Sequence, residues 1–399
     1  MIIPETDLKS KMFSIFSQPN KKRIFLDYAS TTPTDERVLS EMHKVEKFFA
    51  NPSALYKEGA AAGCILEESR EMVAEVLSCK PREVIFTGSG TESCNLALRG
   101  MISNPKDSHI ITTAIEHPAV LESCRALESA GASVTYIKVD ESGVVSVQDV
   151  LDAIRPETRL VSIMYVNNEI GTVQPIRKIG VEIEKINRER DELIYFHSDA
   201  SQAPCYFSIQ PEALKVSALT LDGSKIYGPK GVGVLFSRSG FKISPIVYGG
   251  GQEFGLRSGT ESNVLIRGMA EALHLAVQLM PQEVNRIKVL RNELLEKLIS
   301  IAPSISVNGE LEKRSPHIAN ICIPEADSEF LVMRMDALGV ACSSASSCKA
   351  RHRGVGSHVL EAIGKRKCAS SSLRFSLGRY TTAEDVTLAS ELFRKALSS

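Results

Sequence analysis

The sequence lacks an excess of charge of either sign. Its 399 residues include 47 lysines and arginines and 48 aspartates and glutamates, which gives a formal net charge of -1. Proteins that bind nucleic acid or an anionic membrane through their overall charge carry a clear basic surplus. We therefore expect neither partner, and the composition favours an enzyme that acts on a small molecule.

Long apolar runs and paired cysteines are missing as well. No run approaches the roughly 20 apolar residues that span a membrane, and residues 1–25 lack the apolar core and cleavage site of a signal peptide. The nine cysteines form no CxxC pair, so their spacing indicates neither a disulfide framework nor a zinc site. We expect a cytoplasmic protein without a bound metal, in which most cysteines are small core side chains in a reducing compartment.

The chain does contain enough apolar residues for a full core, since 43% of its residues are hydrophobic and 24% are charged. Its length exceeds that of one ordinary domain. The character of the sequence changes near residue 262. We expect a large α/β domain over 24–262 and a smaller α+β domain over 263–399, completed by residues 1–23.

Short β-branched runs alternate with helical patterns through the first of these regions. Strands are expected at 83–87, 108–114, 133–139, 159–166, 193–199 and 232–236. Helices are expected at 91–102, 118–131, 147–154 and 176–190, and a long helix at 263–302 precedes short strands at 317–323 and 373–378. This alternation predicts an α/β fold with right-handed crossovers and a mostly parallel sheet. Ligands should bind at the carboxyl ends of its strands.

Several chemically useful side chains follow the expected strands. Gly90 and Thr91 lie in a turn that opens a helix, where backbone N–H groups suit a phosphate. The turn is neither a GxxxxGK[ST] loop nor a GxGxxG turn, and by itself it is also typical of an ordinary capped helix. His117 and Asp199 stand at two other strand ends. Either alone would more often be structural, but their common position indicates a site.

The segment LDGSKIYGPKGVG (221–233) adds two lysines among glycines. A lysine in a tight, partly dry pocket can act as an amine nucleophile. Pyridoxal phosphate needs a lysine for a Schiff base, an acidic partner for its pyridinium nitrogen and a seat for its phosphate. Lys225, Asp199 and the turn at Thr91 are the candidates, and a ring held there could stack on His117.

Nine segments in order resemble the motif series of the cysteine desulfurases, which are class V enzymes of the pyridoxal phosphate fold type I. The segments are FLDYASTTP, NPSALYKEG, FTGSGTESCNLAL, EHPAVL, VNNEIGTVQPI, HSDASQ, SKIYGPKGVG, GGGQEFGLRSGTES and SLRFSLGRYTT. They extend from about residue 24 to near residue 392 at the family's spacing. The resemblance implies that family's fold, with a mostly parallel seven-stranded sheet in the large domain.

The resemblance also assigns roles around the cofactor ring. It implies Lys225 rather than Lys230 for the Schiff base. His117 would stack on the ring and shuttle a proton, and Asp199 would meet the pyridine nitrogen. Two amides would lie near the phenolic oxygen: Asn168 and Gln202.

Other roles concern the phosphate, the substrate and a second subunit. Gly90 and Thr91 would contribute to the phosphate seat. Thr260 resembles the residue that reaches the phosphate of the partner subunit, which implies a homodimer. Arg374 resembles the guanidinium that grips the substrate carboxylate beside Asn168, a bidentate task that suits its planar fork.

The segment GVACSSASSCKARHRGVGSHVLEAIG (339–364) resembles the loop that carries the family's sulfur-accepting cysteine. That residue would be Cys348, and Cys342 would fall at a core position. Serines precede Cys348 and the basic run KARHR follows it, and nearby positive charge favours the attacking thiolate. The implied reaction converts L-cysteine to L-alanine and leaves a persulfide on Cys348. Its sulfur would pass to an acceptor protein for iron–sulfur cluster, thio-cofactor or transfer-RNA biosynthesis.

Two residues depart from the family pattern beside the lysine. Where the family reads S-x-H-K, with both the serine and the histidine on the phosphate, this chain has Asp222 and Ser224. Ser224 can donate one hydrogen bond, whereas an acidic group beside a phosphate is unfavourable, so we expect weaker cofactor retention. Two alternatives stay open: a lyase of the same fold that acts on selenocysteine, and a cofactor-poor, non-catalytic partner subunit.

Overall fold

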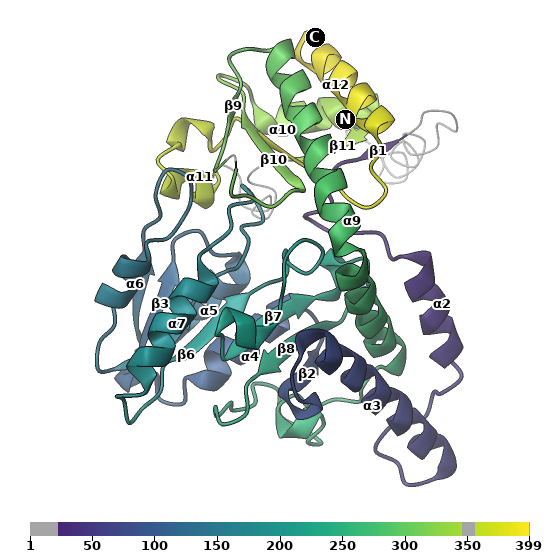
Figure 1. Cartoon of the computed structure of the whole chain (residues 1–399), viewed down its shortest axis with the longest axis vertical. Helices are drawn as coiled ribbons and strands as arrows, with labels where there is room; N and C mark the ends of the chain where they lie inside the picture. Colours follow the sequence, from purple (N-terminus) through teal and green to yellow (C-terminus); the bar gives the residue numbers. More distant parts are fainter. Residues whose placement is uncertain (1–22, 311, 345–355, 399) are drawn as a thin grey trace, which may run out of the picture.

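The computed structural model describes residues 23–310, 312–344 and 356–398 (Figure 1). Its centre is a seven-stranded sheet with β8 antiparallel to both of its neighbours and the remaining pairs parallel. In spatial order the strands are β2 (Val84–Thr87), β8 (Gly233–Ser237), β7 (Ala218–Asp222), β6 (Tyr195–Asp199), β5 (Thr158–Ser162), β3 (His109–Thr113) and β4 (Ser133–Ile137). The predicted α/β class and the mostly parallel sheet are confirmed. The sequence pattern had not indicated β7.

Helices cover both faces of this sheet because successive strand residues point to opposite sides. Ile110 of β3 and Leu160 of β5 pack against α4 and α5, whereas the next residues, Ile111 and Val161, pack in the core formed with α3, α7 and α9. The helices of this part are α2 (Glu36–Val45), α3 (Lys57–Leu77), α4 (Gly90–Met101), α5 (Pro118–Ser129), α6 (Val147–Asp152), α7 (Ile176–Asn187) and α8 (Pro211–Leu214). Helices α2 and α3 were not among the expected elements.

A second, antiparallel sheet has four strands in the order β12 (Ser343–Ser344), β13 (Ser372–Ser376), β10 (Ile318–Cys322) and β9 (Ser306–Val307). Near it, β1 (Ile24–Phe25) pairs in parallel with β11 (Val340–Ala341). The accompanying helices are α10 (Ser328–Leu338), α11 (His358–Ala362) and α12 (Ala383–Ser398). None of the helices in the described ranges has the length and apolar character that crossing a membrane requires.

One helix connects the two parts. Helix α9 (Asn263–Ile301) is 39 residues long and runs from the lower to the upper part in Figure 1. Residues in its first half, from Ile266 to Ala276, belong to the core on one face of the large sheet. Residues in its second half, from Ile287 to Leu298, belong to the core of the small one. The division near residue 262 stays a prediction.

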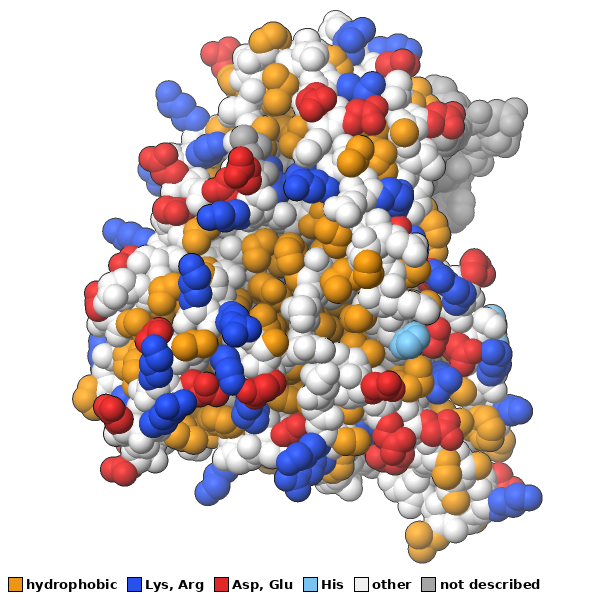
Figure 2. All heavy atoms as spheres, viewed as in Figure 1, with side chains coloured by type: hydrophobic (Ala, Val, Ile, Leu, Met, Phe, Trp, Pro, Cys, Tyr) orange, Lys and Arg blue, Asp and Glu red, His pale blue; other side chains and the backbone are white. Residues whose placement is uncertain are grey.

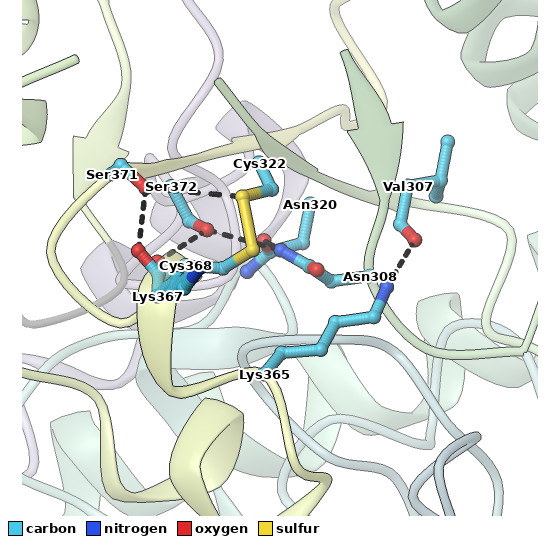
Figure 3. Close-up of a disulfide and its surroundings, with 9 residues drawn as sticks. All are labelled: Val307, Asn308, Asn320, Cys322, Lys365, Lys367, Cys368, Ser371 and Ser372. Atoms are coloured by element: carbon cyan, nitrogen blue, oxygen red, sulfur yellow. Dashed lines mark hydrogen bonds between the residues drawn. A yellow bond between two sulfur atoms is a disulfide. The ribbon is translucent and has the colours of Figure 1, made fainter. Parts of the chain in front are cut away.

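A disulfide joins Cys322, at the end of β10, to Cys368, in the 3-10 turn before β13 (Figure 3). This single pair had not been predicted from the spacing of the cysteines. Spacing alone could not reveal it, because the pairing of β10 with β13 brings together two cysteines 46 positions apart. The other cysteines in the described ranges are free, and four of them are buried as expected: Cys94, Cys124, Cys205 and Cys342.

Reduction of this disulfide should lower the free energy of unfolding by about 2–4 kcal/mol, because a chain without the crosslink gains more conformational entropy when it unfolds than a crosslinked chain does. Two hydrogen bonds nearby do not involve the sulfur atoms: Lys365 Nζ donates to the Val307 carbonyl at 2.8 Å and Ser372 Oγ donates to the Cys368 carbonyl at 2.7 Å. Urea unfolding with and without a thiol reductant measures the change. The double variant Cys322→Ser/Cys368→Ser is the control, and its free energy of unfolding should not change with the reductant. An equal change in the double variant and in wild type would contradict the prediction.

Candidate active site

A cavity of about 190 Å³ opens at the carboxyl ends of β6 and β7, beside the start of α4. This is the edge at which a parallel sheet places its ligands. Most of the predicted site residues line it: Gly90, Thr91, His117, Asn168, Asp199, Gln202, Lys225 and Arg374. The cavity also contains residues that sequence reasoning gave no role there, including Ser30 and Ser201.

Lys225 reaches the cavity from a 3-10 turn (Gly223–Lys225) that follows β7. A Cβ atom at Gly223 would lie 2.8 Å from the Pro229 carbonyl oxygen, so the tight packing of this turn requires glycine. The Lys225 ammonium group donates to the Ser30 carbonyl. Lys230 instead is exposed and donates to the Thr32 carbonyl. The geometry therefore favours Lys225 as the reactive amine.

Asp199 ends β6 and is 8% exposed. Its Oδ1 accepts hydrogen bonds from the backbone N–H and the hydroxyl of Ser201, at 3.0 and 2.6 Å. Behind it, His197 lies buried between the hydroxyls of Ser162 and Thr220, and burial lowers the pKa of His197 to about 4. The histidine is thus neutral at pH 7 and adds no positive charge behind the Asp199 carboxylate.

His117 precedes α5 and caps it. Its Nδ1 accepts a hydrogen bond from the Ala119 N–H at 3.1 Å, so the neutral ring carries its proton on Nε2. Burial lowers the pKa of His117, with Asp199 opposing the shift and Lys225 adding to it. The imidazole is accordingly a neutral donor on the wall of the cavity.

Gln202 is held by two neighbours that sequence reasoning missed. Its amide nitrogen donates to the Ala29 carbonyl at 2.8 Å, and its Oε1 is 3.1 Å from His317 Nε2. His317 is stacked on Tyr206 with ring centroids 4.4 Å apart, and burial lowers its pKa to about 3. A neutral His317 that donates from Nε2 can accept from the Ser315 hydroxyl at Nδ1, 2.6 Å away, so the Gln202 amide has a fixed orientation.

Arg374 enters the cavity from β13 of the small sheet. It is 5% exposed, and its guanidinium donates to the Asn168 carbonyl at 2.8 Å, to Asp27 at 2.7 Å and to the Ser30 hydroxyl at 2.6 Å. Its Nε is buried without a hydrogen-bond partner in the described part of the chain. A fixed guanidinium that lines the cavity suits a substrate carboxylate.

Comparison with known proteins now identifies the family. Residues 24–388 match the family model described as aminotransferase class-V. The chain is 38% identical over 381 residues to "Cysteine desulfurase IscS" of Dictyoglomus turgidum, which covers 94% of this chain and 95% of that protein. It is 39% identical to "Probable cysteine desulfurase, mitochondrial" of Dictyostelium discoideum, over 97% of this chain and 87% of that one. The chain belongs to the cysteine desulfurases.

Solved structures agree with this assignment to the cysteine desulfurases. The structure titled "NIFS-LIKE PROTEIN" superposes with a TM-score of 0.87 at 33% identity, over 94% of this chain and all of that one. The structure titled "SspA in complex with cysteine" gives a TM-score of 0.76 at 35% identity, over 90% and 100% of the two chains. The predicted fold type I is confirmed, and the cysteine desulfurase family uses pyridoxal phosphate.

The residues of the cavity fit that cofactor at its ring. A carboxylate, an amine and a neutral imidazole face one space from three different strand ends, and this donor set matches the pyridine nitrogen, the aldehyde carbon and the ring face. At the other end, the N–H groups that begin α4 suit a phosphate. Here a Cβ at Gly90 would lie 2.9 Å from Asp222 Oδ2, so the cradle is narrow and a carboxylate already borders it.

Three predicted residues are not among those that line the cavity. Ser224 lies beside it, with its hydroxyl 2.6 Å from Asp222 Oδ1. Thr260 is exposed on the segment before α9. Cys348 falls outside the described residues, so its position stays a prediction.

Glu116 is a buried carboxyl group next to His117 that sequence reasoning missed. Its Oε1 accepts from the Thr113 hydroxyl at 2.6 Å and the Met164 N–H at 2.9 Å, which ties the ends of β3 and β5 together. Its Oε2 is buried without a hydrogen-bond partner in the described ranges. Burial raises the pKa of Glu116 to about 8, so the group is mostly protonated at pH 7.

Glu116→Gln should stabilise the protein at alkaline pH. The folded-state pKa of about 8 exceeds the unfolded value near 4.5, so wild-type stability is lost as pH rises between these values. The glutamine variant avoids this loss, and its advantage should grow by roughly 4 kcal/mol between pH 5 and pH 9 at about 1.4 kcal/mol per pKa unit. Urea unfolding at both pH values measures it. Glu122→Gln, an exposed change on α5, is the control. If the difference in unfolding free energy between Glu116→Gln and wild type were the same at both pH values, the prediction would be contradicted.

Proposed function

We propose that this cysteine desulfurase converts L-cysteine to L-alanine with Lys225 as its reactive amine, and transfers sulfur from a persulfide on Cys348 to an acceptor protein. The observation that supports it is the convergence of Lys225, Asp199 and Arg374 on one cavity from two different sheets. An amine, a pyridinium partner and a carboxylate grip are the three groups that this chemistry requires.

Arg374 is the proposed grip for the substrate carboxylate. Its guanidinium is already fixed by Asp27, Ser30 and the Asn168 carbonyl, so little side-chain entropy is lost when a carboxylate binds. The carboxylate would then set the distance between the α-carbon and Lys225. Asn168, whose carbonyl contacts Arg374, would help to orient the same group.

Proton transfer is assigned to two side chains. The bound cofactor supplies an electron sink for the substrate α-carbon. Lys225 would hold the cofactor through its amine, and once the substrate amine has taken its place the freed Lys225 amine would remove the α-proton. Asp199 keeps a negative charge where the pyridine nitrogen would lie. His117, neutral and protonated on Nε2, is placed to donate a proton as the products form.

Sulfur transfer balances without an external oxidant. The Cys348 thiolate attacks the sulfur of the substrate, an S–S bond forms, and the C–S bond of the substrate breaks. The carbon that loses sulfur gains a proton, so that one thiol and one cysteine give one persulfide and one alanine. The KARHR run after Cys348 is the sequence feature that favours the thiolate.

A homodimer, a protein acceptor and a cytoplasmic location complete the proposal. Large apolar side chains are exposed on the part that carries the large sheet, as expected of a subunit interface: Phe49, Leu55, Tyr56, Val247, Tyr248 and Phe254. Thr260 would reach the partner subunit's cofactor phosphate. On the face in Figure 2, acidic and basic side chains are interspersed, which gives no sign of a nucleic-acid surface there.

The direct test is release of alanine and sulfide from L-cysteine by the purified protein with added pyridoxal phosphate and a thiol reductant. The proposal requires both products in equal amounts. Selenocysteine, assayed in parallel, should be turned over no faster than cysteine. Bound cofactor without turnover of either substrate would overturn the assignment.

A further inference from the structure

Asp222 places its carboxylate at the start of α4. Its Oδ1 accepts from the Ser224 N–H at 2.8 Å and the Ser224 hydroxyl at 2.6 Å. Its Oδ2 accepts from the Gly90 N–H at 3.1 Å. Both Asp222 and Gly90 line the cavity that contains Lys225. One carboxylate thus connects the turn that carries the lysine to the helix end that suits a phosphate.

The backbone fixes this carboxylate in place. Asp222 is the last residue of β7 and pairs with Gly233 of β8. A Cβ at Gly233 would lie 2.5 Å from the carbonyl carbon of Ser89, the residue before α4, so β8 and the start of α4 are in direct contact. Since β7, β8 and α4 pack this closely, the Asp222 side chain has little freedom to leave the helix end.

The helix end already carries a second acidic group. Glu92, in the first turn of α4, accepts from the Gly88 N–H at 2.8 Å and pairs with Arg257 at 2.8 Å. Arg257 therefore offsets Glu92, whereas the Asp222 carboxylate has hydrogen-bond donors but no ion pair in the described ranges. A helix N-terminus stabilises an added anion by its N–H groups and dipole, and here Asp222 takes part of that capacity.

The remaining charged and titratable groups around the cavity do not offset the negative charge of Asp222 at the start of α4. Lys225 donates to the Ser30 carbonyl, and in a cofactor-bound enzyme its amine would be engaged by the ring. His117 is neutral because burial lowers its pKa. Asp199 adds negative charge at the ring end, and Arg374 is paired with Asp27. A phosphate at the α4 N-terminus would meet the Asp222 carboxylate at short range.

We propose that Asp222 determines how the enzyme binds the phosphate of its cofactor: the carboxylate and the phosphate share the N-terminus of α4, so the site prefers a phosphate of low charge and binds the cofactor weakly. The inference rests on the proposed function. It extends to pH, because a phosphate monoester loses its second proton at a pKa of about 6. Affinity for pyridoxal phosphate should therefore fall between pH 6 and pH 8, and affinity for pyridoxal, which has no phosphate, gives the reference at each pH.

The test is a cycle of two ligands and two proteins, read as equilibrium dissociation constants from the visible absorbance of the bound ligand. Asp222→Asn keeps an acceptor for Ser224 and removes the charge. It should bind pyridoxal phosphate at least tenfold more tightly than wild type at pH 8, and pyridoxal within threefold. The ratio of the dissociation constants of pyridoxal phosphate and pyridoxal should also change less with pH in the variant than in wild type. Asp149→Asn, at the start of α6, is the control and should behave as wild type.

Weaker binding of pyridoxal phosphate to Asp222→Asn, or an equal change for both ligands, would overturn the inference. Asp222→Ser, which restores the residue type of the family at this position, provides a second variant if the first unfolds, and circular dichroism checks both. Failure of wild type and variants alike to attach either ligand to Lys225 would overturn the proposed function itself. Tight ligand binding with no effect of Asp222 would leave the proposed function standing and remove only this inference.

Discussion

Replacing Cys348 by serine should reduce the release of alanine and sulfide by about 10³-fold or more, the size of effect seen when a covalent nucleophile is removed. A serine hydroxyl is not ionised near neutral pH and does not attack sulfur, so no persulfide can form. Cofactor binding should be unchanged. Product assays and mass spectrometry of the protein after incubation with L-cysteine measure the two consequences.

Cys342 provides the matched control for that experiment. It is six positions earlier in the same segment, 8% exposed, and packed in the core of the small sheet. Burial raises the pKa of the Cys342 thiol to about 12, so it forms no useful thiolate at pH 7. Cys342→Ser should retain activity. If the persulfide survived in Cys348→Ser and disappeared in Cys342→Ser, Cys342 would be the nucleophile and the assignment to Cys348 would be wrong.

Lys225→Ala should lose both the visible absorbance of the lysine-bound cofactor and turnover, the latter by about 10³-fold or more. No other lysine amine lines the cavity in the described ranges. Absorbance spectra with added pyridoxal phosphate, together with product assays, measure the two losses. Added small amines offer a further check, because they can replace a missing base without restoring a lost fold.

Lys230→Ala is the corresponding control. Lys230 is exposed and donates to the Thr32 carbonyl, which lies outside the cavity lining. Its removal should leave the spectrum intact. If Lys230→Ala lost the absorbance while Lys225→Ala kept it, the choice between the two lysines would be wrong.

Much of the large sheet could be predicted because short β-branched and aromatic runs alternate with helical periods along its sequence. Residues 193–199 contain β6, and the expected helix at 176–190 contains α7. β7 was not predicted because ALTLD has only one β-branched residue and no aromatic residue, which is a weak strand signal. The common edge of parallel strands explains why Asp199 and His117 could be grouped before their geometry was known, whereas Lys225 joined them through the chemistry that pyridoxal phosphate requires.

The contacts that orient these residues could not be predicted in the same way. His317 reaches Gln202 across 115 positions and Arg374 reaches Asp27 across 347. The first pair depends on how the small sheet sits against the large one and the second on how the segment after β1 lies beside β13, and no local pattern records either arrangement. Glu116 gave no signal either, because a glutamate before a histidine is ordinary until its burial is known. For Asp222 and Gly90, 132 positions apart, the resemblance implied a common place at the phosphate, and the structure adds their direct hydrogen bond.

Because residues from two sheets line the cavity, a bound substrate would contact both sheets at once. Arg374 belongs to the four-stranded sheet and Lys225 follows a strand of the seven-stranded one, and α9 runs through the cores of both. Under the proposed function, an amino acid held by its carboxylate at Arg374 and by its nitrogen at the Lys225 end would contact both parts of the protein. Binding at the cavity would therefore stabilise the contact between these two parts. Loss of either contact when the product leaves would remove that added stability.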